Sequence, residues 1–220
     1  MLLPDICACI TSVDDLAQAV AVRDMAALYE VRMDLIGEDW PAVVAGLPRP
    51  WIACNRPVSQ GGRCTSEEGL RLESLHRAVS LGAALVDIEM TAPGARRFIE
   101  TVRGRVRVIV SDHDFERTDS AEALGGTVWQ ERNLGADICK VVTTAQSIDD
   151  VSRMMRLVRR FRSDGIVAFA MGPLGAASRI LAPLAGAAFT YASLMSGHES
   201  APGQLTVEAL WELYDAIGGD

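Results

Sequence analysis

Lysine is nearly absent from this chain of 220 residues. Lys140 is the only lysine among the 21 basic residues, and the other 20 are arginines. Long apolar runs are missing too, since none approaches the roughly 20 residues that a helix needs to span a bilayer. The first ten residues contain no basic segment and no cleavage site typical of a secretory signal. We therefore expect a cytoplasmic protein that makes no contact with membranes.

A basic stripe is also lacking. The formal net charge of −8 argues against a protein that binds the phosphate backbone of nucleic acids. A few arginines in a cleft can still reverse the potential locally, so an anionic small-molecule substrate remains open. The five cysteines form no CxxC pair and no tight ligand cluster, which argues against a zinc site and predicts reduced, buried thiols. We expect neither a metal nor another cofactor.

Eight short apolar runs alternate with segments of helical spacing. The runs cover residues 6–11, 27–35, 51–55, 84–90, 106–112, 136–142, 166–171 and 188–193. Eight strand–helix units in a chain of this length predict a compact (β/α)8 barrel, a TIM barrel, as a single domain over residues 1–220. An open doubly wound sheet is the structural alternative. It would more often place glycines in the turn after the first strand, which here reads TSVDD.

Four helical segments open with a capping signature, in which two polar side chains take up amide protons of the first turn. The pairs are Ser12 with Asp15, Thr65 with Glu68, Asp119 with Glu122, and Ser147 with Asp150. Two glycine-containing loops, residues 56–64 and 195–204, follow predicted strands. Active sites of barrels form at the carboxyl ends of the strands, so we expect both loops at the site.

Charged residues occupy one face of two predicted strands. In YEVRMDL, Glu30, Arg32 and Asp34 alternate with apolar residues, and in VDIEM, Asp87 and Glu89 do so. Side chains two positions apart share a face of a strand. Strands of parallel barrels are usually apolar on both faces. An exposed edge strand or an internal salt bridge would explain one such strand, whereas a polar cleft at the barrel mouth would explain several.

Two further polar residues follow predicted strands: Arg56 follows the third and His113 follows the fifth. Charges gathered at the ends of four different strands favour the cleft. A lone histidine is more often a surface or capping residue, and we interpret His76 and His198 in that way. His113 is different because it lies at a strand end, one strand before Lys140.

Lys140 lies inside the apolar run GADICKVV, where a lysine is costly to bury. Arginine keeps its proton, whereas a lysine amine can lose it and become a nucleophile. Burial and neighbouring cations should lower the pKa of Lys140, so that the amine can attack a carbonyl and form an imine, or Schiff base. His113 is then a candidate base for the carbon beside the imine. A GC-rich genome would explain why lysine is rare, but not why the one lysine that is present lies in an apolar strand.

Five motifs together resemble type I 3-dehydroquinate dehydratases. They are EVRMD (30–34), SDHDFERT (111–118), GADICK (135–140), GAASR (175–179) and SAPGQ (200–204), and their order and spacing match nearly the whole chain. The resemblance implies a (β/α)8 fold and the dehydration of 3-dehydroquinate to 3-dehydroshikimate in the shikimate or quinate pathway. Members of this family are often dimers, so we expect a homodimer.

The resemblance also implies roles for individual residues. Lys140 would form the Schiff base, and His113 would act as general base and acid. Arg179 would bind the substrate carboxylate, for which a planar guanidinium is well suited. The other substrate-contacting residues would be Glu30, Arg32, Arg56, Ser200 and Gln204, the last two on a closing loop. Gln60, Met171 and Tyr191 are accessory candidates.

Gln60 departs from the family, which commonly has glutamate before the two glycines. Glutamine keeps the shape and loses the charge, so the pKa of His113 should be lower here. Two other functions fit parts of the sequence. A class I aldolase-like barrel also has a lysine at the end of strand six, but SAPGQ and the lack of a glycine-rich phosphate turn near the last strands disfavour it. A barrel that binds a carboxylate without turnover is supported only by Gln60.

Overall fold

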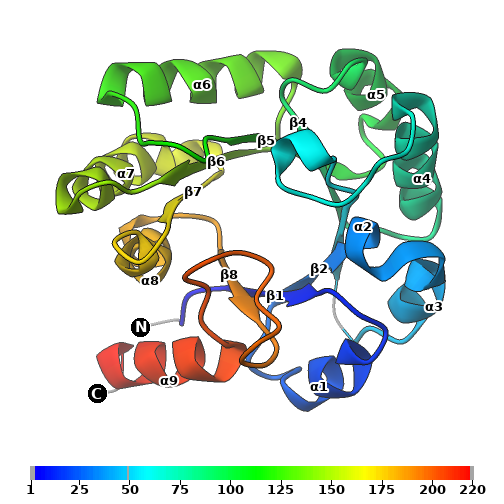
Figure 1. Cartoon of the computed structure of the whole chain (residues 1–220), viewed down its shortest axis with the longest axis horizontal. Helices are drawn as coiled ribbons and strands as arrows, with labels where there is room; N and C mark the ends of the chain where they lie inside the picture. Colours follow the sequence, from blue (N-terminus) through cyan, green and yellow to red (C-terminus); the bar gives the residue numbers. More distant parts are fainter. Residues whose placement is uncertain (1–2, 49, 219–220) are drawn as a thin grey trace.

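Eight parallel strands curve into a barrel in the computed structural model, which describes residues 3–48 and 50–218 (Figure 1). The strands are β1 (Ile6–Ile10), β2 (Leu28–Arg32), β3 (Trp51–Cys54), β4 (Leu85–Glu89), β5 (Arg107–His113), β6 (Ile138–Thr144), β7 (Ile166–Met171) and β8 (Thr190–Ser193). Each strand overlaps one predicted apolar run, so the (β/α)8 fold is confirmed. Residues 1–2, 49 and 219–220 of the predicted domain lie outside the described part.

Helices follow the strands and cover the outside of the barrel (Figure 1). The α-helices are α1 (Asp15–Ala21), α2 (Met33–Ile36), α3 (Trp40–Ala45), α4 (Glu68–Ser80), α5 (Ala95–Val102), α6 (Ala121–Leu134), α7 (Ile148–Phe161), α8 (Ala176–Ala185) and α9 (Val207–Gly218), and the 3-10 helices are η1 (Gly37–Asp39), η2 (Val58–Gln60) and η3 (Arg162–Asp164). Within the described ranges, none of the helices is long and apolar enough to cross a membrane.

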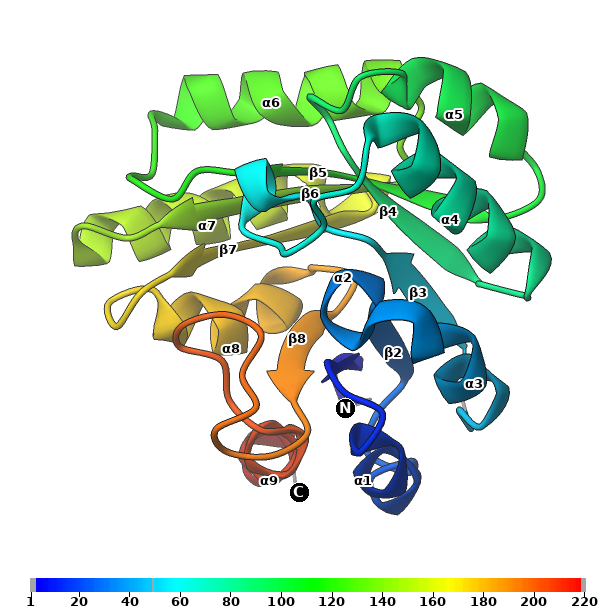
Figure 2. The same ribbon diagram turned by 45° about the vertical axis from the view of Figure 1, so that its right-hand side comes forward.

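The barrel has one seam, between β7 and β8. The strands pair in the order β7-β6-β5-β4-β3-β2-β1-β8, so no ladder joins the two ends of this series over the described residues. Figure 2 shows the ribbons of β7 and β8 apart, with α8 beside them. The Ala188 amide donates to the Ile166 carbonyl at 2.8 Å, and the rings of Phe169 and Tyr191 meet edge to face. Side chains therefore do most of the closing at this seam.

The side chains that point into the barrel form an apolar layer followed by a charged layer along the strands. Residues two positions apart on a strand share this inward face, so one strand contributes to both layers. On β2, buried Leu28 precedes Glu30 and Arg32, and on β6, Ile138 precedes Lys140. The apolar members belong to one cluster in the barrel interior. The charged members lie nearer the carboxyl ends of the strands, so an apolar layer supports the polar site from below.

The capping signatures have mixed outcomes. Ser147 and Asp150 form the predicted capping box at α7. At α1 only half of the prediction holds: the Asp15 carboxylate accepts the Ser12 amide, but the N-cap is Asp14, and the Ser12 hydroxyl accepts the Asp14 amide. The prediction for α6 is wrong by one residue, because Ser120 caps this helix and Asp119 pairs with an arginine instead. The prediction for α4 is also wrong: its N-cap, Glu67, makes no side-chain cap bond.

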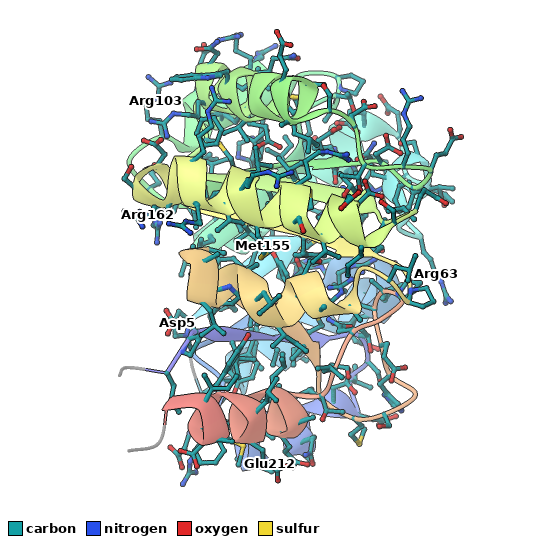
Figure 3. All side chains as sticks on the ribbon, turned by 90° about the vertical axis from the view of Figure 1, so that its left-hand side faces the viewer. Asp5, Arg63, Arg103, Met155, Arg162 and Glu212 are labelled. Carbon is teal, nitrogen blue, oxygen red and sulfur yellow. The ribbon has the colours of Figure 1, made fainter. Side chains whose placement is uncertain are left out.

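Residues that precede strands lie at one end of the barrel, and residues that follow strands lie at the other. Figure 3 shows Asp5, Arg103 and Arg162, which precede strands, at one end of the molecule, and Arg63, which follows β3, at the other. The two glycine-containing loops also follow strands, as predicted.

All five cysteines are free thiols, and four of them are buried while Cys64 is partly exposed.

Candidate active site

One cavity at the carboxyl ends of the strands collects all the residues predicted to be catalytic, substrate-contacting or accessory, whereas Asp34, Asp87 and Glu89 of the predicted polar cleft do not line it. It is lined by Glu30, Arg32, Arg56, Gln60, His113, Lys140, Met171, Arg179, Tyr191, Ser200 and Gln204. The sequence missed Gly61, Phe115, Val142, Phe169 and Ala201, which also line it. These residues are small or apolar. Only Phe115 had a signal in the sequence, because it directly follows His113 and Asp114 in the motif SDHDFERT.

Lys140 is buried and bonded to two carboxylates. Its Nζ donates to Asp87 Oδ2 at 2.8 Å and to Glu30 Oε1 at 3.4 Å, and it lies 4.4 Å from the centre of the Tyr191 ring. Burial alone would lower the pKa of Lys140, but Asp87 and Glu30 outweigh it and raise the pKa above the usual value. The expectation of a lowered pKa is therefore wrong for this arrangement, because the strand pattern did not reveal which carboxylates meet the amine.

Asp87 is the centre of a buried ionic network. Its Oδ2 accepts from Arg56 Nη2 at 2.7 Å as well as from Lys140, and its Oδ1 accepts from Ser111 Oγ at 2.6 Å. Burial would raise the pKa of Asp87, but the charges of Arg56 and Lys140 hold it well below the usual value. Arg56 also donates to Glu89 Oε1 at 2.7 Å. Asp87 and Glu89 share a face of β4, as predicted. Both bind Arg56, and Asp87 also binds Lys140.

His113 lies at the end of β5 with one ring nitrogen engaged. Its Nδ1 is 3.1 Å from Gln60 Oε1, and its ring stacks on Phe115 with a centroid distance of 6.0 Å. Burial lowers the pKa of His113 well below the usual value, and the charges of Arg56 and Lys140 add to this effect. A neutral imidazole that donates from Nδ1 to the Gln60 oxygen leaves Nε2 as a free base.

Arg179 holds an unpaired charge in the cavity wall. Its side chain comes from the first turn of α8, is 2% exposed, and stacks over the Phe169 ring at 4.2 Å. In the described part of the chain no carboxylate pairs with it, its Nε has no hydrogen-bond partner, and Nη2 reaches only the Pro202 carbonyl at 3.4 Å. Burial lowers the pKa of Arg179 to about 10. An unpaired buried cation of this kind favours an anionic ligand.

Arg32 is held by a residue that the sequence placed wrongly. Asp34 is not on β2 with Glu30 and Arg32, because the strand ends at Arg32 and Asp34 belongs to α2. Its carboxylate accepts both Nε and Nη2 of Arg32, at 2.9 and 2.7 Å. It also accepts the backbone amide of Arg63 at 3.0 Å. Asp34 therefore ties Arg32 to the loop that carries Gln60.

The loop before α9 folds over the cavity through Gln204. The Oε1 of Gln204 accepts from the amide and the hydroxyl of Ser200, at 2.8 and 3.1 Å. The Nε2 of Gln204 reaches the Cys9 sulfur at 3.2 Å. His198 of the same loop lies 3.3 Å from Asp15, outside the cavity, in agreement with its interpretation as a surface residue.

Three donors in the site are close enough to hold a metal. Oxygen or sulfur atoms of Glu30, Cys54 and Asp87 all lie within 4.8 Å of one another. The Lys140 ammonium, however, already bonds both carboxylates, and Arg56 bonds Asp87. The negative charge of this group is thus neutralised by the chain itself, and the residues fit an ammonium ion better than a metal ion.

Comparison with known proteins identifies the family. The sequence model of type I 3-dehydroquinase matches residues 6–220. The chain belongs to this family. A 3-dehydroquinate dehydratase of Dehalococcoides mccartyi is 40% identical over 214 residues, which cover 97% of this chain and 96% of the relative. The bifunctional 3-dehydroquinate dehydratase/shikimate dehydrogenase of Arabidopsis thaliana is 36% identical over 88% of this chain and 33% of its own length.

Solved structures agree with this membership of the type I 3-dehydroquinase family. The 3-dehydroquinate dehydratase of Enterococcus faecalis aligns with a TM-score of 0.81 at 26% identity, over 98% of this chain and 94% of that one. The type I enzyme of Clostridium difficile aligns with a TM-score of 0.86 at 21% identity, over 98% and 92% of the two chains. This second likeness establishes the barrel fold.

Proposed function

We propose that this protein dehydrates 3-dehydroquinate to 3-dehydroshikimate in the shikimate pathway, with Lys140 as the Schiff-base lysine and His113 as general base and acid. The proposal is carried by one observation: a lysine, a histidine and an arginine without a carboxylate partner among the described residues line the same cavity. A substrate with a ketone and a carboxylate could meet Lys140 and Arg179 together. Membership of the type I 3-dehydroquinase family supports this reaction.

The reaction is balanced with these groups alone. The Lys140 amine adds to the substrate ketone and the adduct loses water, which leaves a protonated imine. His113 takes a proton from the carbon beside the imine, and the electron pair moves into the imine to give an enamine. The enamine then expels the neighbouring hydroxyl, which takes the proton from the imidazolium and leaves as water. Hydrolysis of the conjugated imine releases the product and restores the amine.

Lys140 must lose its proton before it attacks. Of its two carboxylate partners, Asp87 is already bonded by Arg56 and Ser111 and is held ionised. Glu30 has no arginine partner among the described residues and lies 3.4 Å from Nζ on the cavity wall. We assign Glu30 as the first acceptor of that proton, in addition to contact with a substrate hydroxyl.

Reductive trapping tests the proposal. The protein is incubated with 3-dehydroquinate and borohydride, and its mass is measured together with enone absorbance. We expect an adduct on Lys140, and since the chain has one lysine, digestion separates this adduct from one on the N-terminal amine. Lys140→Arg keeps the charge and should abolish turnover and trapping. Turnover by Lys140→Arg would contradict the imine mechanism.

The same experiment separates the alternatives. An aldolase-like enzyme would form an adduct with other ketones and leave 3-dehydroquinate unconverted. A barrel that only binds a carboxylate would give neither an adduct nor an enone, although 3-dehydroquinate would still bind. Either result would overturn the proposed dehydration.

We further propose that the protein is a cytoplasmic homodimer. Leu181 and Leu184 of α8 are 43% and 41% exposed, which supports contact with a second copy. Sedimentation equilibrium should give twice the mass of one chain, and Leu181→Glu should shift the equilibrium to the monomer. Cell fractionation checks the location. A monomer at micromolar concentration would contradict the dimer without affecting the proposed reaction.

A further inference from the structure

Arg71 lies outside the cavity but is connected to it by buried ion pairs. It belongs to α4 on the outside of the barrel, does not line the cavity, and is 1% exposed. A buried guanidinium requires a good set of partners to offset the loss of hydration. The partners of Arg71 are the Glu68 carboxylate on its own helix, the Asn55 carbonyl and the Glu89 carboxylate on β4.

Glu89 divides its two oxygens between two arginines. Its Oε1 accepts from Arg56 Nη1 at 2.7 Å, and its Oε2 lies 2.8 Å from Arg71 Nη1. The same Nη1 donates one of its two protons to the Asn55 carbonyl at 2.9 Å and forms an ion pair with Glu89 Oε2. Charge attraction therefore holds Glu89 against Arg71, and each arginine keeps one oxygen.

Arg71 also holds the backbone that carries Arg56. Asn55 directly precedes Arg56, so the bond from Arg71 to the Asn55 carbonyl fixes the main chain at the end of β3. Arg71 thus clamps Arg56 twice, at the backbone before it and at the carboxylate that receives its guanidinium. Arg56 in turn donates to Asp87, the main partner of Lys140.

We propose that Arg71 is a positioning residue for the active site, which fixes Arg56 and Glu89 and through them the charges around Lys140 and His113. Without Arg71, Glu89 is left with one oxygen that has no cation. The Arg56 guanidinium can then turn to take both Glu89 oxygens and withdraw from Asp87. Asp87 would be left to Lys140 and Ser111, and the positive charge near His113 would move away.

The withdrawal of Arg56 should change the pKa values of His113 and Lys140 in a direction that follows from the charges around them. His113 is faced by Arg56, Lys140 and Arg32, whose charges lower its pKa, and by Asp87, which raises it, while Gln60 and Phe115 contact its ring. Lys140 is faced by Asp87, Glu30 and Cys54, which raise its pKa, and by Arg56, which lowers it. The Tyr191 ring also contacts Lys140. Withdrawal of Arg56 therefore raises the pKa of both groups. Since both act in their neutral forms, activity should begin to rise only at higher pH.

The test compares Arg71→Met with the wild type. This inference rests on the proposed function only for its kinetic readout, so the pKa of His113 in the free protein is also measured, by NMR titration. We expect the His113 pKa to move up and the rise of kcat/KM with pH to move in the same direction. At pH 7, kcat/KM should fall about tenfold to a hundredfold, as is usual when a reacting group is misplaced.

Arg77→Met is the matched control, since Arg77 is an exposed arginine of the same helix that stacks on Trp40. It should leave both the His113 pKa and the pH profile unchanged. If Arg71→Met does not fold, as judged by circular dichroism, Arg71→Lys serves instead, because a single ammonium cannot reproduce the whole set of contacts. A smaller upward shift is then expected.

A folded Arg71 variant with the wild-type His113 pKa and the wild-type pH profile would overturn the inference. A fall in kcat at every pH without a shift would do the same, because it indicates a merely structural role. Absence of 3-dehydroquinate turnover in the wild type would defeat the proposed function, whereas the NMR titration would still test Arg71.

Discussion

At the scale of single residues, the protonation of His113 depends on what its Nδ1 meets. Gln60 offers a neutral oxygen at 3.1 Å, in a place where the family resemblance leads one to expect a carboxylate. A neutral partner orients the ring but does not stabilise the imidazolium. The histidine is therefore a ready base, and it gives up its proton easily in the second half of the reaction.

Gln60→Glu should raise the pKa of His113, because a carboxylate beside Nδ1 favours the charged ring. The rise of kcat/KM with pH should then move to higher pH, and the activity lost at low pH should return above neutrality. Gln60→Asn, which keeps a neutral amide but shortens the side chain, is the control for distance. A pH profile of Gln60→Glu that coincides with the wild type would contradict the assignment of His113 as the base.

The residues themselves could be predicted well, and their environments less well. A single lysine within an apolar strand is visible in the sequence, and so are a histidine and arginines at strand ends. The pKa of Lys140 was predicted in the wrong direction, because the carboxylates that raise it come from β2 and β4. Sequence periodicity assigns a residue to a face of a strand but does not determine which residues of other strands it contacts.

At the scale of elements, α7 begins with a closed set of hydrogen bonds. The Oδ2 of Asp150 accepts the amides of Gln146 and Ser147 at 2.8 and 3.0 Å, and Oδ1 accepts from Arg153 at 2.6 Å. This capping box was predictable because all its members are close in sequence. The helix start at α4 was not, because Glu68 is recruited by Arg71. A capping signature fails where another side chain of the same helix competes for the carboxylate, as Arg71 does three residues after Glu68.

Asp150→Ala should lower the free energy of unfolding by about 1–2 kcal/mol, since three donors lose their acceptor. Asp149→Ala is the matched control. Asp149 is the exposed neighbour in the same first turn, so its removal costs only the weaker interaction with the helix dipole. Urea unfolding of both variants gives the comparison. Equal losses in the two would contradict a capping role for Asp150.

At the scale of the whole molecule, one buried acid makes stability depend on pH. Glu131 of α6 is fully buried, and neither carboxylate oxygen has a hydrogen-bond partner in the described residues. The neighbouring Cys139 thiol donates to the Val128 carbonyl instead. Burial raises the pKa of Glu131 well above the usual value, and Asp112 adds to the effect. A polar residue at a core-facing helical position is not explained by the sequence pattern or by the site.

A raised pKa in the folded state means that folding is favoured while Glu131 stays protonated. This contribution is complete below the unfolded pKa of about 4.3 and is lost as the pH rises toward the folded value. Glu131→Gln cannot ionise, so its free energy of unfolding should exceed that of the wild type by an amount that grows between pH 5 and pH 8. Glu122→Gln, an exposed change on the same helix, should follow the wild type. A constant difference across this range would contradict a protonated Glu131.

Because Lys140 is the one lysine of the chain and is buried, cleavage after this residue reports how often the folded protein opens. An endoproteinase that cuts only after lysine has one target, in the middle of a strand that is 5% exposed at that residue. Cleavage into residues 1–140 and 141–220 must then wait until the barrel opens, and its rate follows the population of open molecules. Once borohydride has fixed the substrate on Lys140, the target should disappear, and even the denatured chain should remain whole.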